Sequence, residues 1–305
     1  MVLGGLLAPM FLAPTQARGA NSSTNVVGWG GSGGGQLDIP AGTYTALSSR
    51  VSGTFALRSD GGIVGWGTNV PTPPAGSFTA VAKGYTNGVA IKPDGTLAAW
   101  GNPAYGLNTV PTSDHFQAIA ATDFTNLGLR TDGTLFAWGN DGSGQVSNVP
   151  SGTFKAIAAG ELDFYAIRSD GTLVGWGDAG FGGTLVPSGT FKAVAGGYDH
   201  AVGIRTDGTL AIWGNLNSGM TPVPSGTFTA VAAGELWSAA LRTDGTIVAW
   251  GNDFFNWGYL HPPTGSYVSL AAGENFGLAV TAVPEPGAAM TLIGIAMSVR
   301  VRRRR

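Results

Sequence analysis

Carboxylates are the residues of this chain best suited to chemistry. Glycoside hydrolysis needs two acids flanking one bond, and Glu161 with Asp163 or Glu235 could supply such a pair. The three histidines are far apart, and none stands in a nucleophile-elbow, zinc-binding or phosphate-loop pattern. The chain has no cysteine. We therefore expect a non-enzyme with no metal and no cofactor, and keep the acid pair as the enzymatic alternative.

These acids lie in a repeat whose spacing does not vary. Each complete copy opens with an aromatic residue, has Asp-Gly sixteen residues later, and has a tryptophan six residues after the aspartate. Residues 153–177 are one such copy. The opening aromatics are Tyr44, Phe78, Phe116, Phe154, Phe191, Phe228 and Tyr267. A period of about 37 residues is typical of a propeller or a solenoid.

The seventh copy is divided between the two ends of the repeat region. It opens at Tyr267 but has Val283 at the aspartate position, and its missing strand, NVVGWG, stands at Asn25–Gly30. An open solenoid would instead need capping repeats at both ends. We therefore predict an all-β fold over residues 25–283. It is a seven-bladed β-propeller in which the N-terminal strand completes the C-terminal blade.

Each blade is expected to contain three strands. The second strand turns into the third at Asp-Gly, which predicts a type I′ hairpin turn with positive φ at both central residues. The third strand ends in Trp-Gly. Large apolar side chains at a fixed repeat position are typical of a core, so we assign packing between blades to Trp29, Trp66, Trp100, Trp138, Trp176, Trp213 and Trp250.

Three positions in each copy follow no repeat pattern. They begin seven residues after the opening aromatic, between the first and second strands. A divergent window in an invariant frame predicts a loop tip, where binding residues concentrate. Strand direction places the residues after each Trp-Gly on the same face. The predicted binding face contains Tyr85, Asp123, Phe124, Glu161, Asp163, Tyr198, Asp199, His200, Glu235, Trp237, Asp253, Phe254, Phe255, Trp257, Glu274 and Phe276.

This face is acidic and aromatic. Residues 25–283 contain 10 Lys and Arg against 17 Asp and Glu, a net charge of −7, although the whole chain has −2. Nucleic-acid binding needs a basic surface, so nucleic acid is excluded as a partner. Large aromatic side chains suit recognition of a protein or stacking on a sugar ring. The plainer alternative is that exposed acids are simply good turn residues.

The repeat resembles a known family. The pattern Ala-Val-Ala-Ala-Gly, a hydrophobic strand and then Asp-Gly-Thr-Leu-Val-Ala-Trp-Gly is similar to the regulator of chromosome condensation repeat in a short bacterial form, and the resemblance covers residues 25–283. It implies a seven-bladed propeller closed by a shared blade. In blade length and in its Trp-Gly…Val-Pro connectors, the chain is similar to a secreted propeller that inhibits β-lactamases.

The two ends of the chain have their own patterns. Residues 1–20 have an apolar run and small residues before a cleavage point, which predicts a secretory signal peptide. Residues 284–305 hold Pro-Glu-Pro, a short apolar run and an arginine-rich end, and resemble a PEP-CTERM sorting signal. That resemblance implies transient membrane anchoring, processing by an exosortase, and export to the cell envelope or extracellular matrix of a Gram-negative bacterium.

We thus expect an exported, non-enzymatic propeller that engages a protein or an extracellular polysaccharide through its loop face. Two alternatives remain open. One is a carbohydrate-active enzyme that uses acids of that face, and the other is a purely structural matrix component.

Overall fold

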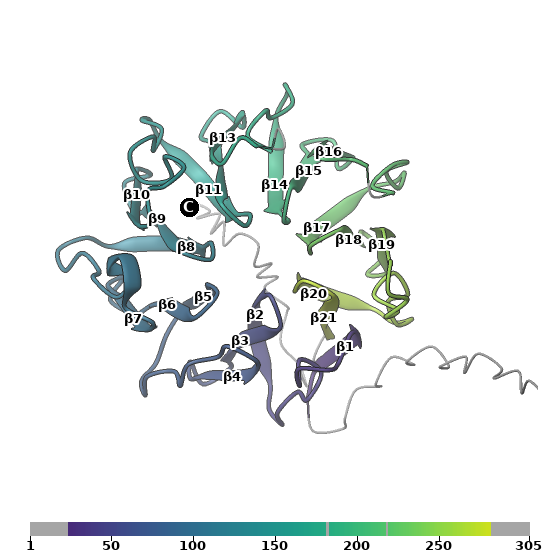
Figure 1. Cartoon of the computed structure of the whole chain (residues 1–305), viewed down its shortest axis with the longest axis horizontal. Helices are drawn as coiled ribbons and strands as arrows, with labels where there is room; N and C mark the ends of the chain where they lie inside the picture. The colour runs from purple at the N-terminus through teal and green to yellow at the C-terminus, as the bar shows by residue number, and fades with distance from the viewer. Residues whose placement is uncertain (1–23, 181–182, 218, 282–305) are drawn as a thin grey trace, which may run out of the picture.

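The computed structural model describes residues 24–180, 183–217 and 219–281. Its strands form seven antiparallel three-stranded sheets, arranged around a central axis as the blades of a propeller (Figure 1). In these residues the one helical element is a 3-10 turn, η1 (Ala104–Gly106). The all-β, seven-bladed fold expected from the repeat is confirmed. The expected signal peptide (1–20) and sorting segment (284–305) lie outside the described residues.

Each blade uses its three strands in a fixed order from the axis outward. The first strand of each blade lies nearest the axis: β2 (Tyr44–Arg50), β5 (Ala80–Lys83), β8 (Phe116–Ala121), β11 (Phe154–Ala159), β14 (Phe191–Gly196), β17 (Phe228–Ala233) and β20 (Tyr267–Ala272). The middle strands are β3 (Gly53–Arg58), β6 (Asn87–Ile91), β9 (Thr125–Arg130), β12 (Asp163–Arg168), β15 (His200–Arg205), β18 (Trp237–Arg242) and β21 (Phe276–Thr281). The outer strands are β4 (Ile63–Gly67), β7 (Leu97–Gly101), β10 (Leu135–Gly139), β13 (Leu173–Gly177), β16 (Leu210–Gly214), β19 (Ile247–Gly251) and β1 (Val26–Gly30).

The ring closes as the divided seventh copy predicts. Strand β1 pairs antiparallel with β21, with Val26 opposite Val280 and Gly30 opposite Phe276. Strand β21 in turn pairs with β20, so the sheet order is β1-β21-β20. The N-terminal strand therefore supplies the outer strand of the C-terminal blade.

The hairpin turn between the second and third strands differs from the prediction. In the first blade the Gly61 N–H donates to the Arg58 carbonyl, and the Arg58 N–H donates to the Gly62 carbonyl. Gly61 has φ +87, whereas Asp60 is not among the described non-glycine residues with positive φ. This is a three-residue loop with one left-handed residue, the type I turn with a bulge, so the type I′ assignment was wrong. The Asp60 carboxylate accepts the Gly62 N–H at 2.9 Å, which stabilises the turn.

Apolar clusters fill the spaces between neighbouring blades throughout the described structure. The seven repeat tryptophans are all buried in these clusters. Trp29, for example, packs edge-on against Trp237 of the preceding blade. Most of the indole N–H groups donate to a carbonyl of the preceding connector: Trp29 to Tyr259, Trp66 to Gln36, Trp138 to Leu107, Trp176 to Gln145 and Trp213 to Gly183. Those of Trp100 and Trp250 have no partner in the described structure.

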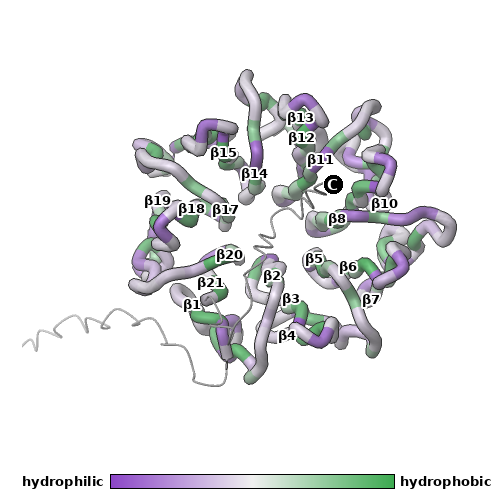
Figure 2. The backbone as a smooth tube through the Cα atoms, turned by 180° about the vertical axis from the view of Figure 1, so that it is seen from behind, coloured by the Kyte–Doolittle hydropathy of each residue, from purple (hydrophilic) through white to green (hydrophobic). Residues whose placement is uncertain are grey.

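Small residues bring the first strands close together around the axis. A methyl group on Gly196 would lie 2.5 Å from the Gly160 Cα of the neighbouring blade, closer than any side chain can approach. The small residues of the Ala-Ala-Gly pattern therefore set the narrow radius of the ring. In Figure 2 the middle strands β15 and β18 are mostly hydrophobic, and hydrophilic residues gather in turns and connectors.

Candidate functional site

The loops between first and second strands lie on one face of the propeller, together with the residues that follow each Trp-Gly. Backbone hydrogen bonds join the two sets: Asn102 N to Thr86 O, Asn140 N to Phe124 O, Asn215 N to Asp199 O and Asn252 N to Leu236 O. The shared face expected from strand direction is confirmed. We refer to it as the loop face.

The first residue of six of the seven variable windows lies on a ring around the axis. In chain order the ring residues are Val51, Asp123, Glu161, Tyr198, Glu235 and Glu274. Neighbouring loops are linked directly, because the Glu235 N–H donates to the Glu274 carbonyl at 3.1 Å and the Glu274 N–H donates to the Val51 carbonyl at 3.0 Å. The loop tips are therefore held against one another rather than projecting separately into solvent.

This ring surrounds one end of a central channel of about 1440 Å³. The channel walls are the first strands, with small apolar side chains such as Ala158, Ala195 and Ala232. We call the carboxylates at this end the acidic mouth: Asp123, Glu161, Glu235 and Glu274. Sequence spacing identified each of these acids, but it did not show that they converge on one opening.

One acid of the mouth is neutralised and the others repel one another. The Arg50 guanidinium Nε lies 2.6 Å from Asp123 Oδ1. Burial, opposed by Arg50 and reinforced by Asp123 and Glu235, raises the pKa of Glu161 to about 7. Burial and then the neighbouring Glu274 raise the pKa of Glu235. The two residues are neighbours on the ring, since the Glu235 N–H donates to the Glu274 carbonyl.

The third residue of each window is not at a loop tip, contrary to the prediction. It begins the middle strand and its side chain is buried between blades, as Asp163, His200, Trp237 and Phe276 show. Trp237 is fully buried, packs at a tilt against Tyr259 with 5.3 Å between ring centroids, and donates to the Glu274 carbonyl. The sequence lacks a repeat pattern here because each pair of blades fills this space differently.

Asp163 is a buried acid within this layer. Its Oδ2 accepts the Tyr165 hydroxyl at 2.6 Å, and its Oδ1 has no hydrogen-bond partner in the described structure. Burial raises the pKa of Asp163 to about 7, and the Tyr165 hydrogen bond only partly opposes this. Asp163 therefore cannot pair with Glu161 as a hydrolase would require, because it lies beneath the surface.

A serine–histidine–aspartate arrangement also lies in this layer. His200 Nε2 is 2.8 Å from Ser238 Oγ, and Asp199 Oδ1 is 3.9 Å from His200 Nδ1. The residue types match a nucleophilic relay. However, Ser238 and His200 are both buried, so no substrate reaches the hydroxyl. The arrangement joins two blades and does not form an active site.

Three aromatic residues of the longest connector are exposed, whereas Tyr259 of the same connector is buried. We call Phe254, Phe255 and Trp257 the aromatic finger; their side chains are 74%, 63% and 39% exposed. Phe255 stacks on Trp257 with ring centroids 4.8 Å apart and planes at 23°. The Asp253 carboxylate accepts the Trp257 N–H and the Gly258 N–H, each at 2.8 Å. Asp253 is therefore a turn former that holds the finger.

A second aromatic group lies over the blades of β5–β10. Phe124 packs edge-on against Tyr85 and Tyr105, with ring centroids 6.4 Å and 5.8 Å apart. The sequence reasoning missed Tyr105, which lies in η1 and is 59% exposed. The sequence feature that could have identified Tyr105 is its place as an aromatic residue in a connector. We call these three residues the tyrosine cluster.

Lys83 is a buried basic residue to which the sequence assigned no role. Its ammonium group is buried and donates to the carbonyls of Asn69, Gly84 and Tyr85 at 2.9–3.0 Å. Burial lowers the pKa of Lys83 to about 8. Its stem fills the space beside Gly53, which has no side chain. Lys83 therefore ties the first two blades together and does not offer a free charge to a ligand.

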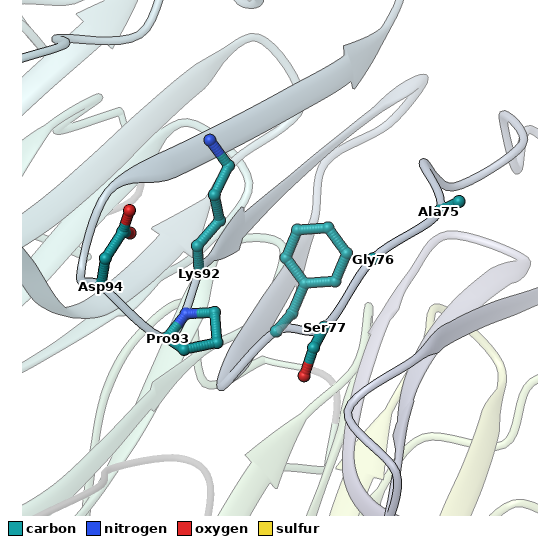
Figure 3. A pocket seen from close by; sticks show the side chains of 7 residues that line it. Ala75, Gly76, Ser77, Lys92, Pro93 and Asp94 are labelled. Atoms are coloured by element: carbon teal, nitrogen blue, oxygen red, sulfur yellow. The ribbon is translucent and has the colours of Figure 1, made fainter.

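The opposite face has a smaller hollow of about 330 Å³ between Phe78 and the turn Lys92–Asp94 (Figure 3). The Asp94 carboxylate caps its own turn by accepting the Thr96 N–H and hydroxyl. The carboxylate beside the hollow is therefore engaged in its own turn and is not arranged to bind a ligand. Among the described residues, no cluster of three or more metal-ligating side chains exists, and no helix is long and apolar enough to span a membrane.

The chain is similar to known proteins both in its repeat sequence and in its seven-bladed fold. Two stretches match the regulator of chromosome condensation (RCC1) repeat. They are residues 116–145 and 191–219, which fall on the third and fifth blades. No curated protein matches the chain by sequence.

Solved structures with similar folds include RCC1-type propellers. Prp20p from Saccharomyces cerevisiae is 17% identical, with 85% of this chain and 92% of that chain covered and a TM-score of 0.72. Human WBSCR16 is 15% identical, with 84% and 98% covered and a TM-score of 0.71. The ectodomain of the Physcomitrella patens receptor kinase CR4 is 21% identical, with 79% and 71% covered and a TM-score of 0.67. At these identities the likeness establishes an RCC1-like propeller fold.

Proposed function

We propose that this RCC1-like propeller is a non-enzymatic binding module whose loop face engages a protein. The observation that carries this is the aromatic finger, a set of large apolar side chains held in solvent by a turn that is already formed. Rigid aromatic side chains bury much area at a low entropy cost when they bind. Surface clusters of this kind are typical of interaction sites.

Further support comes from how the candidate catalytic groups are placed. Asp163 and Ser238 are buried, so neither side chain is open to a substrate. The fold is also one that Prp20p has, whose structure was reported together with its binding to Gsp1p and histones. An extracellular polysaccharide is the second ligand class, because Phe255 and Trp257 are exposed aromatic residues against which a sugar could pack.

We further propose that the chain is exported and kept at the cell envelope or extracellular matrix of a Gram-negative bacterium. The signal-peptide pattern of residues 1–20 and the sorting-signal pattern of residues 284–305 support this. A partner would then be met outside the cytoplasm, and an exosortase would process the C-terminal end. Cell fractionation with antibodies to the propeller tests the location.

The binding proposal is tested by capture on the immobilised protein. Envelope proteins and a glycan array are applied to the unchanged protein and to a variant with Phe254, Phe255 and Trp257 replaced by alanine. Leu185→Ala is the matched control, since Leu185 is a 76% exposed apolar residue of another connector. We expect a protein retained by the unchanged protein and by the control, and lost from the finger variant. Retention on all three would refute the site, and glycan retention alone would favour the polysaccharide.

A further inference from the structure

The two aromatic groups stand on opposite sides of the acidic mouth. The tyrosine cluster belongs to the blades of β5–β10 and the aromatic finger to the connector between β19 and β20, and Figure 1 places these blades across the ring from one another. Each aromatic group adjoins the acidic mouth. Phe124 directly follows Asp123, and the Asn252 N–H beside the finger donates to the Leu236 carbonyl next to Glu235.

The charge between the aromatic groups is negative and has little compensation within the described loop face. Arg50 is engaged with Asp123, and the ammonium of Lys83 is buried against three carbonyls. Glu161, Glu235 and Glu274 remain on the ring without a cation of their own among the salt bridges of the described residues. Their mutual repulsion is relieved by a proton or by a cation brought from outside.

From this arrangement we infer that the partner is a basic protein segment, with a Lys or Arg side chain at the acidic mouth and apolar side chains on the finger and the tyrosine cluster. The inference rests on the proposed function, because it specifies what the loop face binds. Charge complementarity selects the occupant: phosphate-bearing molecules are repelled, and a neutral sugar would leave the carboxylates uncompensated. Aromatic side chains also attract cations over their ring faces.

A peptide selection tests this inference without knowledge of the natural partner. A phage-displayed library of random 12-residue peptides is selected on the immobilised full-length protein. We expect the selected sequences to be enriched in Lys and Arg next to Leu, Phe or Trp. A synthetic copy of the most frequent peptide is then measured by fluorescence anisotropy.

Two variants separate the charge from the aromatic contribution. Glu235→Gln with Glu274→Gln keeps the shape of the mouth and removes two of its four carboxylates, and we expect affinity at least tenfold weaker with a smaller dependence on NaCl. Phe254→Ala with Phe255→Ala should weaken binding about tenfold and leave the salt dependence unchanged. Asp170→Asn with Asp207→Asn is the matched control, because it neutralises two acids on the opposite face.

The outcomes distinguish the inference from the proposed function. Selection of neutral or acidic peptides, or equal affinity in the glutamine variant and the control, overturns the basic partner while a binding face remains. Peptides that bind the finger variant as tightly as the unchanged protein overturn the aromatic contribution. If the library yields no binding peptide and the envelope capture retains no protein, both proposals are overturned.

Discussion

Asp163 provides a stringent test of the electrostatics derived above. Its carboxyl group is buried between two blades, one oxygen accepts the Tyr165 hydroxyl, and the other has no partner in the described structure. The pKa of a buried acid rises because burial disfavours the charged form. Near neutral pH the unchanged protein pays a free-energy cost for ionising this buried carboxyl group. We predict that replacing Asp163 with asparagine removes that cost.

The magnitude follows from the pKa of about 7 in the folded protein against an ordinary value of 3.8. Each unit of difference corresponds to 1.36 kcal/mol, so the full effect is about 4 kcal/mol. The sign follows from proton binding, since the folded state holds the proton more tightly than the unfolded state. The contribution of the Asp163 proton to the free energy of unfolding is therefore full below pH 4. It falls as the pH rises toward about 7, and it is lost above that pH.

The assay is urea unfolding between pH 4 and pH 8, followed by tryptophan fluorescence. Asp163→Asn keeps an acceptor for the Tyr165 hydroxyl, so we expect the variant to match the unchanged protein near pH 4. At pH 8 it should be more stable by about 3–4 kcal/mol. Asp207→Asn on the exposed opposite face is the control. The reasoning is refuted if Asp163→Asn and the unchanged protein keep parallel pH profiles.

Three further predictions concern the ring. Trp176→Phe should cost about 1 kcal/mol more than Trp100→Phe in urea unfolding, because only the first loses an indole hydrogen bond; equal losses would contradict this. Gly196→Ala should lower the melting temperature through overpacking worth about 1–3 kcal/mol, whereas Gly33→Ala, with open space around it, should shift it little. Deleting residues 24–30 should expose the edge of β21 and replace one sharp unfolding transition with a broad one in calorimetry; an unchanged transition would show that β1 is dispensable.

The fold could be predicted because its determinants repeat. The fixed spacing from aromatic to aspartate to tryptophan identifies strands and turns six times over, and the divided seventh copy indicates closure. Strand direction then places the loops and the Trp-Gly ends on one face. The turn type was wrong because Asp-Gly serves both two-residue and three-residue loops, and only the length of the loop distinguishes them.

The site was less predictable, since it depends on distances between blades. Sequence spacing identified Glu235 and Glu274 separately, yet their proximity depends on the narrow radius set by small residues such as Gly196. Trp237 was expected among the exposed aromatics, but it fills the space beneath Tyr259. A side chain that departs from the repeat can therefore be a ligand contact or a packing solution, and local sequence does not distinguish the two.

Closure by β1 has a consequence for how the chain reaches its native state. Val26 pairs with Val280, 254 residues later, so during synthesis the first strand has no native partner until nearly all the propeller has been made. Contacts of such long sequence separation form slowly. We expect the last blade to assemble last, and until then the apolar side chains of Leu278 and Val280, buried in the closed ring, are open to other chains. We therefore expect the risk of aggregation to increase with the time that the chain spends before closure.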